Sequence, residues 1–255
     1  MRIALKCAYN GKPFHGFARQ PKLKTVEGDI INVLVRLGYF SKPKDALFRS
    51  ASRTDKGVSA FGNVISFNTE KKLDFLLTDC NEQLENIIIY GVKMVDNSFY
   101  PRHAKQRIYQ YHLKKNMLDY SELRSIFSLF IGTHDFSNFA RIEPYKNPMK
   151  TIDDIKISET KDFFIISFYA QNFLWHQIRR IIATIQQIEQ QKISKDDIIF
   201  SLHHPEKMVD YGLSSPSPLV LMDVIYDFSF EHSEKWQKEK RKLEKRIIQN
   251  IKCPS

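Results

Sequence analysis

The sequence predicts an α+β protein built from two similar halves. The chain has 255 residues, enough for one large domain or two small ones. Residues 1–100 read as β-α-β-β-α-β from their apolar periodicity, and residues 101–230 follow a similar order of elements without repeating the sequence. Residues 231–255 form a charged tail. We expect the halves to share a continuous, mostly antiparallel sheet through residues 96–107, with a central cleft as the natural site.

The first half begins with residues 2–9, which alternate as a strand with one somewhat polar face. Residues 25–38 predict a helix, with Thr25 as N-cap and Gly38 closing it. We expect the remaining elements to be a short strand ending near Ala51, a strand at 61–69, a helix from about Leu73 to Leu84 and a buried strand at 86–95. This order is that of a ferredoxin-like (RRM-like) half, with helices on one face of the sheet.

The second half contains strands at 107–115, 151–158, 163–170 and 219–230 and helices at 121–130, 174–190 and 194–204, with Ser121 as one N-cap. Residues 231–252 are charged throughout, with apolar residues at helical spacing at Trp236, Leu243, Ile247 and Ile251. Such a helix either docks on the body of the protein or presents a basic face to RNA or to a second subunit.

The chain is basic, with 39 Lys and Arg against 29 Asp and Glu. A net charge of +10 favours a polyanionic partner, nucleic acid above all, although it also serves solubility alone. Cys7, Cys80 and Cys253 show neither metal-ligand nor redox spacing, which is typical of a reducing cytoplasm. We expect neither a signal peptide nor a membrane span.

The stretch "RSASRTDKGVSAFGNVISF" holds an Arg-Thr-Asp triplet between two apolar runs. Thr-Asp-Lys-Gly has good β-turn chemistry, so Asp55 is a candidate turn residue. In an extended segment, Arg53 lies on the same side as Asp55 and would favour the ionised carboxylate. Asp55 is therefore also a candidate nucleophile or base.

Two basic segments with aromatic neighbours are candidate RNA contacts. One carries Arg102, Arg107 and Tyr109, and the other carries Phe173 and His176 beside Trp175. Stacking and phosphate contact are one interpretation, and core packing of the aromatic residues is the other. The sequence has no HExxH, P-loop or GxGxxG motif, so we expect no metal and no nucleotide cofactor.

Six segments resemble, in order, the motifs of the TruA family of tRNA pseudouridine synthases. "SRTDKGVSA" is similar to the catalytic motif of that family. The others are "AYNGKPFHGFARQP", "FYPRHAKQRIYQYHL", "GTHDFSNFA", "NFLWHQIRRIIATI" and "SPLVLMDVIYD". The likeness covers nearly the whole chain, and spellings such as "GFARQP" resemble the archaeal branch most.

The resemblance implies an enzyme that isomerises uridine to pseudouridine in the tRNA anticodon stem-loop, nominally at positions 38 to 40. It also implies a homodimer. Because the isomerisation gains and loses no atoms and involves no redox step, we expect no cofactor, and the cysteines favour a cytoplasmic location. Asp55 matches the catalytic aspartate that acts at the ribose C1′, Arg53 its neighbouring arginine, and Tyr109 the tyrosine on the target base. The further substrate contacts that we expect are Arg179, which pairs with the aspartate, Leu219, which walls the pocket, and Arg19, Arg102, Arg107, Phe173 and His176.

Five positions depart from the family pattern: Asn10, Ser52, Lys56, Ser59 and Pro218. None of these changes removes a group that the chemistry needs, but together they leave the substrate range open. Two alternatives differ in kind. One is an RNA-binding protein without catalysis on the same scaffold, and the other is a nucleosidase that hydrolyses the same bond.

Overall fold

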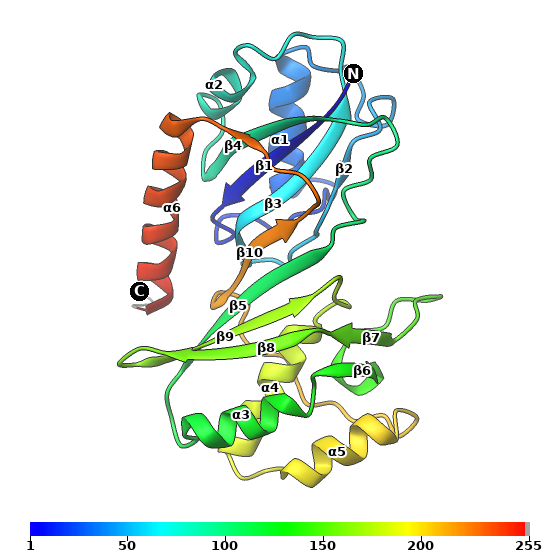
Figure 1. Ribbon diagram of the computed structural model, residues 1–255, viewed down its shortest axis with the longest axis vertical. Coiled ribbons are helices and arrows are strands. Elements are labelled where there is room, and N and C mark those ends of the chain that lie inside the picture. Colours follow the sequence, from blue (N-terminus) through cyan, green and yellow to red (C-terminus); the bar gives the residue numbers. More distant parts are fainter. Residues whose placement is uncertain (253–255) are drawn as a thin grey trace. The chain divides into compact units, whose positions relative to one another are not determined.

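The structure is a computed structural model, which describes residues 1–252 (Figure 1). The predicted α+β class with a large, mostly antiparallel sheet is confirmed. The chain forms two compact units. Unit 1 comprises Met1–Lys105 and the chain from Val220 onward, and unit 2 comprises Gln106–Leu219. Among the described residues, no helix is both long enough and apolar enough to cross a membrane.

Unit 1 has the predicted β-α-β-β-α-β order. Its elements are β1 (Arg2–Tyr9), α1 (Val26–Arg36), β2 (Arg49–Ser50), β3 (Ser59–Asn68), α2 (Leu76–Asn81) and β4 (Ile87–Val95), followed by β10 (Leu219–Ile225), β11 (Glu231–His232) and α6 (Glu234–Lys252). The first residue of β10, Leu219, is counted with unit 2. The strand order is β11-β4-β1-β3-β10, and β2 pairs with the outer part of β3. β1 is antiparallel to both of its neighbours, whereas β10 runs parallel to β3.

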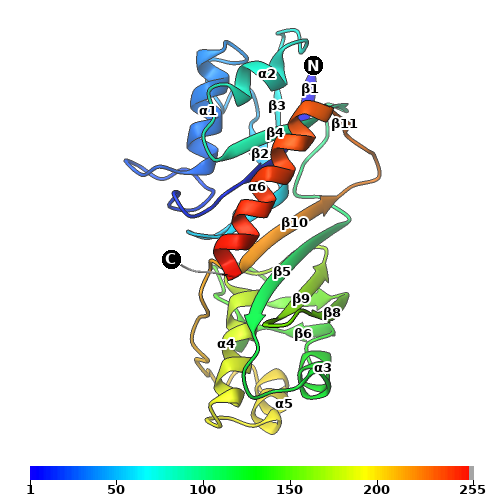
Figure 2. The same cartoon turned by 90° about the vertical axis from the view of Figure 1, so that its left-hand side faces the viewer.

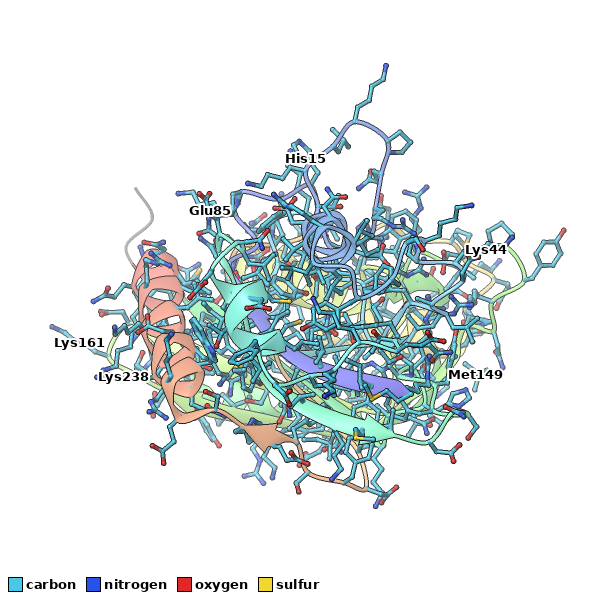
Figure 3. The ribbon with its side chains drawn as sticks, turned by 90° about the horizontal axis from the view of Figure 1, so that it is seen from above. His15, Lys44, Glu85, Met149, Lys161 and Lys238 are labelled. Carbon is cyan, nitrogen blue, oxygen red and sulfur yellow. The ribbon has the colours of Figure 1, made fainter. Side chains whose placement is uncertain are left out.

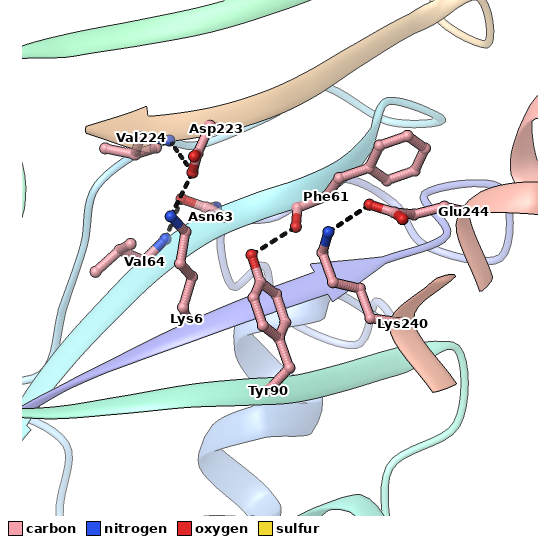
Figure 4. Close-up of polar contacts among 9 residues, drawn as sticks. All are labelled: Lys6, Phe61, Asn63, Val64, Tyr90, Asp223, Val224, Lys240 and Glu244. Atoms are coloured by element: carbon pink, nitrogen blue, oxygen red, sulfur yellow. Dashed lines mark hydrogen bonds and ion pairs between the residues drawn. The ribbon is translucent and has the colours of Figure 1, made fainter. Parts of the chain in front are cut away.

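β1 has the predicted alternation, with Arg2 and Lys6 on its more polar face. Every residue of β1 except Lys6 is buried, since the strand lies between β3 and β4. Lys6 keeps its charge paired with Asp223, at 2.6 Å between Nζ and Oδ1 (Figure 4). Burial raises the pKa of the Cys7 thiol to about 12, so this cysteine is an inert core residue.

The caps of α1 confirm the prediction made for this helix. The Thr25 hydroxyl accepts a hydrogen bond from the Gly28 amide at 3.2 Å, and Gly38 follows the helix with a φ of 75° that suits glycine. α2 is shorter than predicted. It ends at Asn81. The side chain of Asn81 donates to the Ile89 carbonyl on β4 and accepts from the Ile89 amide, each at 2.7 Å.

α6 confirms that the charged tail docks on the body as an amphipathic helix; residues 253–255 lie outside the described part of the chain. Figure 2 shows α6 crossing in front of β4, with α1 farther to the left. Two bulges, at Tyr90 on β4 and near Phe61 on β3, accompany this docking. The buried cluster formed there contains Ala8, Phe61, Tyr90, Val220, Trp236, Leu243, Ile247 and Ile251.

Unit 2 contains a three-stranded antiparallel sheet in the order β5-β9-β8. Its elements are β5 (Gln106–Lys114), α3 (Tyr120–Ser128), β6 (Gly132–Asp135), a 3-10 turn (Ser137–Phe139), β7 (Met149–Ile152), β8 (Asp154–Glu159), β9 (Phe163–Ala170), α4 (Gln177–Glu189) and α5 (Lys195–His203). β6 and β7 form a separate hairpin that the sequence did not predict.

Two details of unit 2 correct the sequence analysis. The N-cap of α3 is Asp119 rather than Ser121, because Asp119 accepts from the Glu122 amide and Glu122 bonds back in a capping box. The single strand predicted at 151–158 is two strands. The break falls at Asp153, which separates β7, paired with β6, from β8, paired with β9.

Candidate active site and nucleic-acid interface

Asp55 is the first residue of a β-turn in unit 1. Its carbonyl accepts the Val58 amide at 3.1 Å, and Gly57 has a φ of 83° that a β-carbon would strain. The turn joins the buried Thr54 to β3, and Asp55 itself is half-buried. The turn interpretation is therefore correct for the backbone, and it presents the carboxylate from a fixed position rather than from a mobile loop.

A buried polar network holds the segment that leads into this turn. The hydroxyls of Thr54 and Tyr9 share a hydrogen bond of 2.8 Å. Asn63, which is fully buried on β3, accepts from the Ser52 amide at 3.2 Å and donates to the Ser52 carbonyl at 3.0 Å. Its amide also donates to Tyr9 at 3.3 Å. These bonds satisfy groups that would be costly to bury without partners.

Two glycines allow residues 11–17 to press against the turn. A β-carbon at Gly11 would lie 2.2 Å from the Val58 carbonyl oxygen, and Gly16 has a φ of 97°. Next to Gly16, the Phe17 amide donates to the Thr54 carbonyl at 3.0 Å. The Gly11 amide donates to Ser59 Oγ at 3.0 Å. Ser59, one of the departures from the family pattern, therefore has a structural role beside the turn.

The predicted arginines of unit 1 are all solvent-exposed. Thr54 turns inward between Arg53 and Asp55, which leaves Arg53 exposed on the outer side of the segment. Arg19 is tied to the start of α1, where its amide donates to Glu27 Oε2 at 2.8 Å. Arg102 lies in the segment between β4 and β5. All three keep a charged group accessible to a polyanion.

In unit 2, Tyr109 lies on β5 and is 9% exposed. The ring of Phe173 meets it edge-on, with centroids 5.4 Å apart and planes at 88°. Tyr111, two residues along, is buried; burial raises the pKa of its hydroxyl, and the positive charge of Arg179 partly offsets this. Tyr109, the predicted tyrosine, is therefore a packed aromatic residue whose ring orientation is defined by Phe173.

The start of α4 holds two predicted residues, His176 and Arg179. His176 precedes the helix with a φ of 64°, an uncommon conformation for a residue with a side chain, and its ring lies 5.0 Å from Trp175. One turn later, Arg179 is 9% exposed, and its Nε donates to the Ser214 carbonyl at 2.9 Å. The helix therefore fixes the guanidinium in a definite position.

Arg141 is a further candidate contact that was not predicted from the sequence. Its guanidinium lies over the Trp175 indole, 4.1 Å from the ring centroid, and its amide donates to the Trp175 carbonyl at 2.8 Å. Trp175 is 41% exposed. A cation stacked on an exposed indole suits contact with nucleic-acid bases. The two residues are far apart in the sequence, so no local pattern could have revealed the pair.

The two remaining predicted residues are buried. Arg107 is 5% exposed and donates to the Gln171 carbonyl, so it supports the segment that leads to Phe173. Leu219 is 6% exposed at the start of β10, and its amide donates to the Pro216 carbonyl at 3.0 Å. An apolar wall is compatible with this burial.

The structure thus groups the predicted residues by unit. Asp55, Arg53, Arg19 and Arg102 belong to unit 1, whereas Tyr109, Arg107, Phe173, His176, Arg179 and Leu219 belong to unit 2. Because they lie in different units, the approach of Tyr109 and Arg179 to Asp55 stays a prediction. Within residues 1–252, no three His, Cys, Asp or Glu side chains are grouped so as to hold a metal ion.

Comparisons with known proteins place this chain in a class and then in a family. A family model described as tRNA pseudouridine synthase matches residues 126–227. The chain is 41% identical to tRNA pseudouridine synthase A of Thermococcus sibiricus, over 89% of this chain and 85% of that protein. It is 36% identical to the proteins of the same name from Thermococcus kodakarensis, over 95% and 91%, and Pyrococcus abyssi, over 98% and 95%.

The chain therefore belongs to the tRNA pseudouridine synthase A family, a family of isomerases. All three relatives are archaeal, in agreement with the branch that the motifs indicated. A solved structure titled "Crystal Structure of a Cbf5-Nop10-Gar1 Complex" aligns at 10% identity with a TM-score of 0.38, over 72% of this chain and 44% of that one, which is too low to establish a common overall fold.

Proposed function

We propose that this protein isomerises uridine to pseudouridine in tRNA and that Asp55 is the catalytic residue. The observation that carries the proposal is the half-buried Asp55 on a rigid turn, in a chain that belongs to this family. The reaction breaks the C1′–N1 bond, turns the uracil and rejoins it through C5. No atoms are gained or lost and no electrons are transferred, so the reaction needs no cofactor.

Asp55 acts at the sugar. Breaking the C1′–N1 bond puts positive character on C1′, which a carboxylate either stabilises or bonds to, as in glycoside hydrolysis. Two routes are open to it: attack at C1′, and a step in which C1′ is relieved by loss of the 2′ proton. A carboxylate in a fixed position serves both routes. Folding has already removed most of its conformational freedom, so little more is lost when it reacts.

Tyr109 acts at the base. Its ring, held edge-on by Phe173, stacks on the uracil, and its hydroxyl removes the C5 proton after the base has rejoined. Leu219 excludes water, so the detached uracil adds back to the ribose instead of escaping as it would from a hydrolase.

Contacts inside each unit hold the chain on both sides of Leu219. Within unit 2, the His112 amide on β5 donates to the Pro218 carbonyl at 3.0 Å, three residues along the strand from Tyr109. Within unit 1, Val220 pairs with Ser59, four residues after Asp55. Leu219 lies between Pro218 and Val220 in the chain, so a backbone contact holds each of its two neighbours.

The RNA partner is the tRNA anticodon stem-loop, with positions 38 to 40 as targets, and the enzyme acts as a cytoplasmic homodimer. The target base must leave its stack, at a cost on the order of a few kcal/mol. Arg53, exposed beside Asp55, takes the vacated space. Arg179, held by Ser214, pairs with the Asp55 carboxylate, and His176, Arg102, Arg19 and the Arg141–Trp175 stack contact the RNA.

The test is a map of pseudouridine in unmodified tRNA transcript after incubation with the protein, with Asp55→Asn in parallel. We expect product from the wild type and, from the variant, a rate below about one thousandth of the wild-type rate, with tRNA affinity unchanged. Asp45→Asn is the matched control, because Asp45 is an exposed turn aspartate in the same unit.

Equal product from the wild type and Asp55→Asn would remove Asp55 from its role. Product from neither protein, with tRNA still bound, would favour an RNA-binding protein without catalysis. Release of free uracil instead of pseudouridine would identify a nucleosidase.

A further inference from the structure

α6 carries a large share of the excess positive charge of the protein. Between Glu234 and Lys252 it has eight basic and three acidic residues, a net charge of +5, against +10 for the whole chain. The helix is 19 residues long. Solubility alone does not explain this clustering, because charges spread over the whole surface would serve it equally well.

The basic residues of α6 gather on the face opposite its apolar residues. At 3.6 residues per turn, Trp236, Leu243, Ile247 and Ile251 fall on one side, and all four are buried. The exposed basic residues outside that apolar side, which we name the α6 stripe, are Lys238, Arg241, Lys242, Lys245, Arg246 and Lys252. Lys235 is also exposed, but its Nζ lies 4.4 Å from the centroid of the Trp236 ring. At 1.5 Å per residue the stripe is about 21 Å long. Figure 3 shows Lys238 at the outer side of the helix.

The acidic residues of α6 do not neutralise the centre of the stripe. Glu244 pairs with Lys240 at 2.5 Å, on the flank next to the sheet, and Glu239 pairs with Lys242 at 2.7 Å. Within the described chain no ion pair is recorded for Lys238, Arg241 or Lys245. Arg241 and Lys245 stand four residues apart on the helix, so their charges repel, and a polyanion lying across them would relieve this repulsion.

The stripe is fixed to the sheet that carries the Asp55 turn. The Tyr90 hydroxyl donates to the Phe61 carbonyl at 2.8 Å, and Lys240 lies over the Tyr90 ring at 5.0 Å while it pairs with Glu244 (Figure 4). Phe61 lies on β3, the strand that begins four residues after Asp55. The helix therefore presents its charges from a definite place in unit 1.

A membrane surface does not fit this arrangement. Amphipathic helices that lie on membranes insert their apolar face between the lipids, and here that face is already buried against Ala8, Phe61 and Tyr90. What remains exposed is a row of cations, which suits a row of phosphates.

We propose that the α6 stripe binds the phosphate backbone of the substrate RNA, away from the target nucleotide, and so holds the RNA on unit 1 while Asp55 acts. This inference rests on the proposed function for the identity of the RNA. The stripe contributes affinity and no chemistry, because its residues neither form part of the Asp55 turn nor contact it.

The test compares Lys238→Gln/Arg241→Gln/Lys245→Gln with Lys42→Gln/Lys44→Gln/Lys72→Gln, which removes the same charge from other exposed positions of unit 1. Affinity for tRNA transcript is measured between 50 and 200 mM salt. Each lost phosphate contact lowers the slope of log K against log salt by about 0.7 to 0.9. We expect the α6 variant to bind at least tenfold more weakly at low salt, with a slope lower by about 2 to 3.

The α6 variant should keep its thermal midpoint, since glutamine removes like-charge neighbours without touching the buried face, and its turnover at saturating tRNA should stay within about twofold. Equal affinities and slopes for the two triple variants would overturn the inference. So would a loss of binding to anionic phospholipid vesicles without loss of RNA affinity. If the wild type bound tRNA but formed no pseudouridine, the proposed function would fail, and the binding comparison would still decide the role of α6.

Discussion

Asp55 and Tyr109 are held in place by two different kinds of interaction. The segment before Asp55 depends on hydrogen bonds among buried polar groups, from Tyr9 and Asn63, and on two glycines that allow close backbone approach. Tyr109 depends on its strand and on the edge of the Phe173 ring. Hydrogen bonds among buried polar groups are prominent in the first region, and aromatic packing is prominent in the second.

This difference determines how each region tolerates change. A buried donor or acceptor without a partner destabilises the fold by its full desolvation free energy. Loss of one polar group should therefore lower stability strongly in the segment before Asp55. Aromatic packing tolerates changes that conserve volume, so substitutions near Tyr109 can separate chemistry from structure. The second region is therefore the better place to test chemical roles, and the first the better place to test positioning.

Among the variants that compare these two regions beyond Asp55 itself, the largest effect is expected for Tyr109→Phe. The ring and its packing against Phe173 remain, but the hydroxyl that removes the C5 proton is lost, so turnover should fall by about a hundredfold or more. Single-turnover formation of pseudouridine at saturating tRNA measures this effect. Tyr169→Phe is the matched control, a partly exposed tyrosine on β9 of the same unit. Turnover near that of the wild type would reject the tyrosine as base, though not as stacking partner.

A smaller effect on activity is expected for Asn63→Ala. The variant leaves the buried amide and carbonyl of Ser52 without their side-chain partner, which should lower the free energy of unfolding by about 2 to 4 kcal/mol. Because the same bonds position the segment before Asp55, turnover should also fall about tenfold at temperatures where the variant is folded.

Asn81→Ala is the control for that experiment. Asn81 is also a buried asparagine of unit 1 that bonds one backbone amide and one carbonyl, those of Ile89, but it belongs to α2. It should lose similar stability in denaturant unfolding and keep its turnover within about twofold. Equal loss of turnover in both variants would show that the Asn63 bonds matter only for stability.

Much of the fold could be predicted because it depends on local patterns. The Thr25 cap, the alternation of β5 and the apolar spacing of α6 are visible within a few residues each, and the structure confirms them. Local patterns also explain the errors. Ser121 and Asp119 are both good caps, and only the bond to the Glu122 amide decides between them. The somewhat polar face expected of β1 consists of Arg2 and Lys6, but the alternation alone does not show that Arg2 is buried.

The sequence indicated the candidate site residues but not the distant residues that hold them in place. Asp55, Tyr109 and Arg179 follow from motifs that can be read along the chain. Their supports come from distant positions, such as Asn63 for Ser52, Ser214 for Arg179 and Arg141 for Trp175. A single sequence has no signal for such pairs, since any buried amide or exposed cation could fill these roles.

The most direct test of the central claim is the structure of the protein in complex with tRNA. We predict that a carboxylate oxygen of Asp55 lies about 3 to 3.5 Å from C1′ of a uridine turned out of its stack, with the Tyr109 ring on the uracil. An Asp55 side chain directed into solvent, with no ribose near it while the RNA is fully bound, would contradict the account.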